Sequence, residues 1–208
     1  VRSVNVRFNR TFTLRTSDGF VENFGSGLVA RVEREAPGVR LHFVPKPDKE
    51  SASLRDGAVD LETGLIERTT GPELRSVALF RDRWVGVTRK GHPLMRGRMT
   101  PERFAGARHV VVSRPGQERS SVDESLAALG LERQVAVSVG GFGIAVGLVR
   151  ATDLVTCVPE RHSGVLRDGL HTFELPIATP DFVVSMLWHP RMDSDPAHRW
   201  LRGCVREL

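Results

Sequence analysis

The sequence predicts an α/β fold in which parallel strands alternate with helices. Two observations lead to this class. In the first part of the chain, segments with strand-like and helix-like spacing of apolar residues follow one another as strand, helix, strand, helix and strand. From about residue 84 the same alternation starts afresh. The length of 208 residues suits one large domain or two small lobes.

The first part contains three expected strands and two expected helices. Residues 11–16 alternate as a strand does, and Ser17 and Asp18 offer a turn and a helix cap. A helix follows, because apolar residues recur at helical spacing until Pro37 and Gly38 stop it: Val21, Phe24, Leu28 and Val32. Residues 39–44 form the second strand. Residues 50–64 form a short helix ended by Gly57 and then a third strand.

The second part continues this pattern to the end of the chain. Glycine and capping residues set the limits of its helices, as Thr100 and Pro101 do for the first. "LRDG" occurs at 54–57 and again at 166–169, where glycine accepts the left-handed conformation after a short helix. The expected strands lie near 84–87, 108–113, 133–139, 153–160, 171–176 and 181–189, and the expected helices at 100–106, 120–131, 140–152, 162–170 and 194–208.

The stretch "VSMLWHPRMDSDPAHRWLR" at 184–202 raises the question of a metal site. His189 and His198 are nine residues apart with prolines between them, so no shared helix aligns them. Asp195 instead fits a helix cap, with Pro196 at the first helical position. The apolar anchors of that helix are Trp200, Leu201, Cys204 and Leu208. We therefore expect a structural role here, and no metal.

Composition excludes several other classes of protein. The net charge is +5, but the basic residues are scattered and form no nucleic-acid footprint. No apolar run is long enough to span a bilayer and no secretory signal is present, so we expect a cytoplasmic protein without membrane contact. The two cysteines, Cys157 and Cys204, are expected to be buried and inert, with a redox pair as the alternative.

Motifs for catalysis are also missing. "FGSGL" at 24–28 lacks nucleophile-elbow spacing and lies in a helix pattern. "GGFGIAVG" at 140–147 follows a strand and opens a helix. Its backbone N–H groups either hold an anion or serve tight packing. The same two readings, anion binding or plain capping, apply to Thr16, Ser17 and Asp18. No convergent acid, base or nucleophile is found, so we expect neither an enzyme nor a cofactor.

Residues 11–208 resemble the effector-binding region of LysR-type transcriptional regulators. The segments that carry the resemblance are "LRDGAVDLETG", "GVTRKGHPL", "DESLAALGL", "ATDLVTCVPER" and, most specifically, "LWHPRMDSDPAHRWLR". The last resembles the branch of nodulation and aromatic-catabolism regulators. The resemblance implies a two-lobed, type 2 periplasmic-binding-protein-like fold. Two Rossmann-like lobes are joined by two crossover strands, with a small effector in the cleft.

The same resemblance implies how the chain is divided. Residues 1–10 would be a linker or tail, residues 11–86 with 184–208 lobe 1, and residues 87–183 lobe 2. The expected effector-binding residues combine this resemblance with the ends of the strands, where ligands of α/β sheets bind. They are Thr16, Ser17, Asp18, Glu62, Thr63 and Gly64 in lobe 1, and Ser113, Gly141, Phe142 and Pro159 in lobe 2.

Two departures from the family pattern bear on the effector. Glu62 and Thr63 stand where the family usually has Ala-Ile, which is expected to place a carboxylate close to the hinge and the pocket mouth. Gly140, Gly141 and Phe142 stand where relatives that sense aromatic acids carry Pro-His-Phe, so a salicylate-like effector is not favoured. Phe142 is expected to be available for stacking, and its replacement by Ala to leave folding largely intact.

We therefore expect a domain that senses a small organic effector, aromatic or carboxylate in type. The resemblance further implies a homodimer or tetramer and DNA binding through an N-terminal domain outside this chain. A free-standing solute-binding protein of a transporter is the alternative.

Overall fold

The computed structural model describes residues 9–46, 50–66, 70–113 and 119–208. The expected tail, residues 1–10, lies outside the described residues except for its last two, and Arg10 already begins the first strand. The chain divides into two compact units. Unit 1 comprises the described residues up to Arg81 together with Val183–Leu208, and unit 2 is Asp82–Phe182. The chain therefore passes between the units twice.

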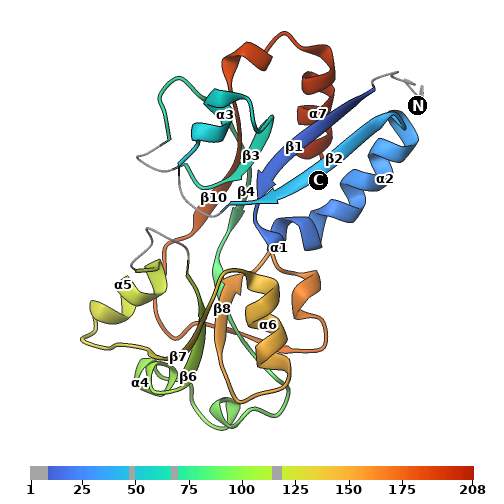
Figure 1. Cartoon of the computed structure of the whole chain (residues 1–208). Coiled ribbons are helices and arrows are strands. Elements are labelled where there is room, and N and C mark those ends of the chain that lie inside the picture. Colours follow the sequence, from blue (N-terminus) through green and yellow to red (C-terminus); the bar gives the residue numbers. More distant parts are fainter. Residues whose placement is uncertain (1–8, 47–49, 67–69, 114–118) are drawn as a thin grey trace. The chain divides into compact units, whose positions relative to one another are not determined.

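Unit 1 is built on a sheet in the order β2-β1-β3-β10-β4. Strand β1 is parallel to both β2 and β3, while β10 is antiparallel to β3. The parallel members predicted from the sequence are thus confirmed at β2, β1 and β3 (Figure 1). The strands are β1 Arg10–Thr16, β2 Val39–Pro45, β3 Leu61–Gly64, β4 Arg75–Asp82 and β10 Phe182–Trp188.

Helices cover both faces of the unit 1 sheet. On one face, the helix that runs from α1 (Asp18–Phe20) through a π-helical turn into α2 (Ser26–Glu35) packs with α7 (Pro196–Arg206) over β1. On the other face, α3 (Ala52–Asp56) buries Leu54 against Leu187 of β10. Successive strand residues point to opposite faces, so Phe12 and Leu14 face the first layer and Arg15 faces α3.

Unit 2 repeats the layered arrangement. Strand β5 (Trp84–Thr88) lies between β8 and β9 and is antiparallel to both. Strand β6 is parallel to β7, and a parallel bridge from His109 to Val155 joins it to the segment before β8. One face packs on α6 and the other on α4 and α5. The remaining elements are α4 Pro101–Ala105, β6 Arg108–Val112, α5 Ser121–Ala127, β7 Gln134–Val139, α6 Phe142–Arg150, β8 Thr156–Pro159 and β9 His171–Glu174.

The helix caps predicted from the sequence are confirmed. The Thr100 hydroxyl accepts from the Arg103 backbone N–H at the start of α4. The Asp195 carboxylate accepts from the His198 backbone N–H at the start of α7. Both "LRDG" glycines are left-handed, with φ of 79° at Gly57 and 78° at Gly169.

Two elements differ from the prediction. Strand β4 was not predicted, because Arg83 alone separates it from β5 and its partly exposed residues give a weak pattern. The helix expected at 162–170 is instead a single 3₁₀ turn, Val165–Arg167. Gly164 and Gly169 leave too few residues between them to nucleate an α-helix.

The C-terminal stretch closes unit 1, as its capping pattern predicted. Trp188 donates its indole N–H to Asp193 over 2.7 Å, and the Arg202 guanidinium lies 4.6 Å from the Trp188 ring centroid. The buried His198 ring bonds the Asp60 carbonyl. Among the described residues, no group of three or more His, Cys, Asp or Glu could hold a metal ion.

Both cysteines are buried and unbridged. Cys204 belongs to the core of unit 1 and Cys157 to that of unit 2. Burial raises the pKa of each thiol to about 11. The prediction of buried thiols is confirmed, and neither is a reactive thiolate at neutral pH.

Candidate functional site

In each unit, the predicted binding residues follow the carboxyl ends of parallel strands. In unit 1, Thr16 ends β1, and Thr63 and Gly64 end the neighbouring β3. Ser17 and Asp18 come next after Thr16. Ligands of open α/β sheets bind outside the carboxyl ends of the strands. The topology of unit 1 thus brings its predicted residues to one edge, which we call the unit 1 edge.

A buried ionic cluster underlies the unit 1 edge, and we call it the Glu62 network. The Arg15 guanidinium lies 2.9 Å from Glu62 Oε1, and the Lys46 ammonium 3.2 Å from Glu62 Oε2. Ser51 donates to Oε2 over 3.0 Å and Ser53 to Oε1 over 3.3 Å. The side chains of Arg15, Lys46 and Glu62 are 7%, 9% and 0% exposed. Charges this deep persist only when paired and hydrogen-bonded.

Strand register explains why these charges meet. Arg15 of β1 stands opposite Glu62 of β3, so both side chains point to the α3 face. Ser51 occupies the N-cap position of α3 but makes no capping hydrogen bond, since its hydroxyl goes to Glu62. Lys46 follows the end of β2, the neighbour of β1 on the other side. Three adjacent parallel strands therefore build the Glu62 network.

The expectation that the Glu62 carboxylate lies close to the hinge and the pocket mouth stays a prediction. Its side chain is fully enclosed, and both oxygens bind side chains of the protein itself. Sequence reasoning also missed Arg15, Lys46, Ser51 and Ser53. The alternation of β1 places Arg15 on the face opposite Phe12 and Leu14, but only the pairing of β1 with β3 identifies Glu62 as its partner.

The other predicted binding residues of unit 1 include two threonines with buried hydroxyl groups and a serine that caps a helix. The Thr16 and Thr63 hydroxyls are hydrogen-bonded to each other, and the two residues are 2% and 3% exposed. Ser17 accepts from the Phe20 backbone N–H, so it caps the first helix. Capping is thus confirmed for Ser17. A role of Ser17 or Asp18 toward an anion stays a prediction.

In unit 2, the predicted residues follow β6, β7 and β8, which run parallel. Ser113 comes after β6 and donates its backbone N–H to the Val139 carbonyl at the end of β7. Gly141 is the extended N-cap residue of α6, and Phe142 begins that helix. Pro159 ends β8, and its carbonyl accepts from the Ser163 hydroxyl. These residues define the unit 2 edge.

Phe142 belongs to the core of unit 2. It is 8% exposed and packs with Trp84 and His162 at centroid distances of 6.2 and 6.4 Å. Trp84 also contacts Phe182, at 5.4 Å. Because of this packing we now expect Phe142→Ala to destabilise unit 2, in contrast to the sequence-based expectation that folding stays largely intact. Contact between its ring and an effector stays a prediction.

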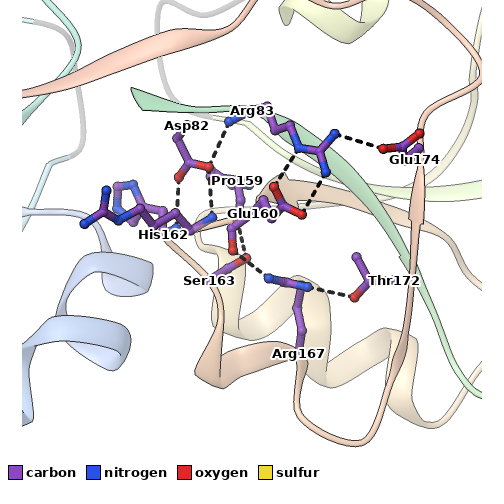
Figure 2. Close-up of polar contacts among 10 residues, drawn as sticks. Asp82, Arg83, Pro159, Glu160, His162, Ser163, Arg167, Thr172 and Glu174 are labelled. Atoms are coloured by element: carbon purple, nitrogen blue, oxygen red, sulfur yellow. Dashed lines mark hydrogen bonds and ion pairs between the residues drawn. The ribbon is translucent and has the colours of Figure 1, made fainter. Parts of the chain in front are cut away.

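Polar contacts fix the loop that follows β8 (Figure 2). The Asp82 carboxylate accepts from the backbone N–H groups of Arg83, Arg161 and His162 over 2.8 to 2.9 Å. Arg83 also pairs with both oxygens of Glu160, at 2.6 and 3.0 Å. The position of Pro159 and His162 is thus set by contacts within unit 2.

Comparison with known proteins agrees with this architecture. The profile of the LysR substrate binding domain matches residues 7–208. The HTH-type transcriptional activator NagR of a Ralstonia species is 32% identical over 204 residues, covering 96% of this chain and 67% of NagR. Nodulation protein D 1 of Rhizobium tropici is 30% identical over 202 residues, covering 95% of this chain and 65% of that protein.

Solved structures give the same result. A probable transcriptional regulator of Pseudomonas aeruginosa matches with a TM-score of 0.85 and 30% identity over 99% of this chain and 69% of its own. The regulatory domain of MexT, a transcriptional activator of the same organism, shares the fold with a TM-score of 0.80 at 24% identity. The match covers 97% of this chain and 99% of the MexT domain.

The fold is therefore that of two-unit, type 2 periplasmic-binding-protein-like sensor domains, as the resemblance implied. The chain belongs to the LysR substrate-binding domain family, whose members are effector-binding domains of LysR-type transcriptional regulators. The relatives named above are transcriptional regulators rather than enzymes. They give no support to a transporter role. Within the described part of the chain, no helix is long and apolar enough to cross a membrane.

Proposed function

We propose that this chain binds a small organic effector at the carboxyl ends of its parallel strands and passes the signal to a DNA-binding part of a longer regulator. The observation that carries the proposal is that the predicted binding residues of each unit lie at the carboxyl ends of parallel strands. Thr16 and Thr63 carry a hydrogen-bonded pair of hydroxyls at the unit 1 edge, and Ser113 carries a hydroxyl at the unit 2 edge, where Gly141 precedes α6.

The mechanism we propose is a shift between conformations. An effector acts by binding one arrangement of the protein more tightly than another, and the shift equals that difference in affinity. In this proposal the protein works as a homodimer or tetramer in the cytoplasm and binds DNA through a separate domain. It catalyses no reaction on its effector.

A thermal-shift screen of small aromatic and aliphatic acids, their amides and phenolics tests effector binding. A ligand at 100 times its Kd stabilises the fold by about 2.7 kcal/mol, which is several degrees for a domain of this size. Thr63→Val should weaken a true hit, because it removes a hydroxyl at the unit 1 edge. The matched control is Thr172→Val, since the Thr172 hydroxyl on β9 accepts from Arg167 and Thr172 is not one of the predicted binding residues.

The expected result is a hit weakened by Thr63→Val and kept by Thr172→Val. A hit that both variants bind as well as the wild type does would place the ligand elsewhere and contradict the assigned edge. Conversion of any hit into a product would contradict the sensing role.

A further inference from the structure

The net charge of the chain is concentrated in residues 88–108 of unit 2, which we call the basic segment. It holds one acidic residue, Glu102, and six basic residues: Arg89, Lys90, Arg96, Arg98, Arg103 and Arg108. Six basic residues against one acidic residue give a net charge of +5, which equals the net charge of the whole chain. The charges of all other residues therefore cancel, and the scatter of arginines along the sequence hides this local excess.

Most of the cations in the basic segment are exposed and lack an ionic partner. The exposed ones are Lys90, Arg96, Arg98 and Arg108. The ion pair that the basic segment forms within the described part of the chain joins Arg89 to Asp153, at 2.6 Å. Among the described residues, the four exposed cations form no salt bridge. Their charge is thus available to a partner outside the chain.

Arg103 holds the loop that displays two of these cations. Its guanidinium donates to the backbone carbonyls of Leu94 over 3.0 Å and of Arg96 over 2.8 Å, and also to the carbonyl of Arg98. Because backbone atoms accept these bonds, the side chains of Arg96 and Arg98 stay exposed. A partner that binds them does not have to order the backbone of this loop, which lowers the cost of binding.

The basic segment lies at the opposite end of the unit 2 strands from the unit 2 edge. It runs from the carboxyl end of β5 to the start of β6. Strand β5 is antiparallel to β8, and the bridge from His109 to Val155 is parallel, so the carboxyl end of β5 lies at the amino ends of β6 and β8. The His92 ring donates to the Asp153 carbonyl over 2.9 Å, which joins the basic segment to the residues before β8. A partner bound here does not compete for the predicted effector-binding residues.

The side chains of the basic segment fit a phosphate backbone better than a protein surface. Protein interfaces centre on apolar and aromatic anchors. The large apolar side chains that are exposed within the described residues all lie outside the basic segment. Its phenylalanine, Phe104, is fully buried and offers no ring on which the bases of a single strand could stack. Exposed arginine and lysine side chains suit the phosphates of an intact duplex.

We propose that the basic segment binds the phosphate backbone of duplex DNA without reading the base sequence. The inference goes beyond the proposed function, because it gives this chain a DNA contact of its own, apart from a separate DNA-binding domain. Phosphate contacts position a protein on DNA, whereas contacts to base edges read the sequence. A site of about four phosphates loses about 100-fold in affinity when the salt concentration rises from about 50 to about 200 mM, because bound phosphates release their counter-ions.

Fluorescence anisotropy of a labelled duplex of about 20 base pairs, titrated with this chain, measures the affinity and its salt dependence. We expect a Kd of micromolar order at low salt, equal for two duplexes of unrelated sequence. Arg96→Gln combined with Arg98→Gln should weaken binding about tenfold or more and reduce the effect of salt from about 100-fold to about tenfold. The matched control combines Arg199→Gln with Arg206→Gln, two exposed arginines of α7 in unit 1, and should bind as the wild type does.

A lysine signal in NMR spectra locates the contact without any substitution in the site. The chain has three lysines, so protein labelled with ¹³C-lysine gives three side-chain Cε signals. We expect duplex DNA to shift the signal of the exposed Lys90. The signal of Lys46, whose side chain in unit 1 is 9% exposed, should stay in place. If the double variant of the basic segment fails to fold, this titration of the wild type still decides.

Four outcomes would overturn the inference. The first is a Lys90 signal that does not respond to DNA at low salt. The second is that the double variant of the basic segment binds DNA as tightly as the double variant of α7, which would assign binding to the net charge of the whole chain. The third is a marked preference for one of the two duplex sequences. The fourth is tighter binding to phosphatidylserine vesicles than to DNA at the same salt, which would assign the basic segment to a lipid surface.

Discussion

The unit 1 edge and the unit 2 edge differ in how far their charged side chains are exposed to solvent. In unit 1, the Glu62 network is enclosed, with side chains that are at most 9% exposed. In unit 2, the Arg83–Glu160 pair is open to solvent, with side chains 46% and 40% exposed, and it fastens a loop. The buried groups at the unit 2 edge are instead aromatic: Phe142 with Trp84 and His162. The comparison shows that the buried groups of the unit 1 edge are charged, whereas those of the unit 2 edge are aromatic.

The largest expected effect comes from breaking the buried charge cluster. Glu62→Gln removes the buried carboxylate that pairs with Arg15 and Lys46, so we expect a loss of about 3 to 5 kcal/mol in the free energy of unfolding. The matched variant Glu160→Gln removes an exposed pair and should cost less than about 1 kcal/mol. Chemical denaturation of both variants measures the contrast. Equal losses in the two variants would show that the buried and the exposed carboxylate contribute equally to stability.

Removing the ring of Phe142 tests the apolar side of the comparison. Phe142→Ala should lower the free energy of unfolding by about 3 to 5 kcal/mol, because it opens a cavity against Trp84 and Val146. Urea denaturation measures the loss, and the more conservative Phe142→Leu should lose much less. A loss below about 1 kcal/mol for the alanine variant would mean that the ring is not a core element.

The elements of both units were largely predictable from local signals. Apolar periodicity, the caps at Thr100 and Asp195, and the glycines of "LRDG" depend on neighbours in sequence. The carboxyl ends of the strands followed from the alternation of elements. The Glu62 network could not be predicted, because the pairing of Arg15 with Glu62 depends on the register of β1 and β3. The burial of Phe142 likewise depends on Trp84, which is far away in sequence.

A buried histidine in unit 2 gives a pH dependence of stability. Burial lowers the pKa of His109 to about 4, and its Nε2 bonds the Phe104 carbonyl over 2.7 Å. The unfolded chain takes up this proton near pH 6.5 and the folded chain does not. Stability is therefore lost as pH falls from about 6.5 to 4, by about 3 kcal/mol over that window.

His109→Gln should flatten this part of the pH profile, measured by thermal or urea unfolding at each pH. The comparison with unit 1 uses His198, whose pKa is also lowered, by burial first of all. His198→Gln should remove a separate part of the dependence of the unfolding free energy on pH. A profile that keeps its full slope between pH 6.5 and 4 in His109→Gln would contradict the assignment.

A smaller loss than for Glu62, Phe142 or His109 is expected when the hydroxyl pair is broken. Thr63→Val keeps the shape of the side chain but leaves the buried Thr16 hydroxyl without this partner. We expect a loss of about 1 to 2 kcal/mol in the free energy of unfolding. The double variant with Thr16→Val should be less than additive, since the two residues share one hydrogen bond. Strict additivity would contradict that bond.

The two cysteines make each unit individually observable. Cys204 lies in the core of unit 1 and Cys157 in the core of unit 2, and burial raises the pKa of both thiols to about 11. A thiol reagent therefore reacts with each one only after the surrounding core opens. The rate of labelling at each position, followed by mass spectrometry in native buffer, reports the local unfolding of that unit. The natural sequence thus carries one built-in reporter of cooperativity in each half of the sensor.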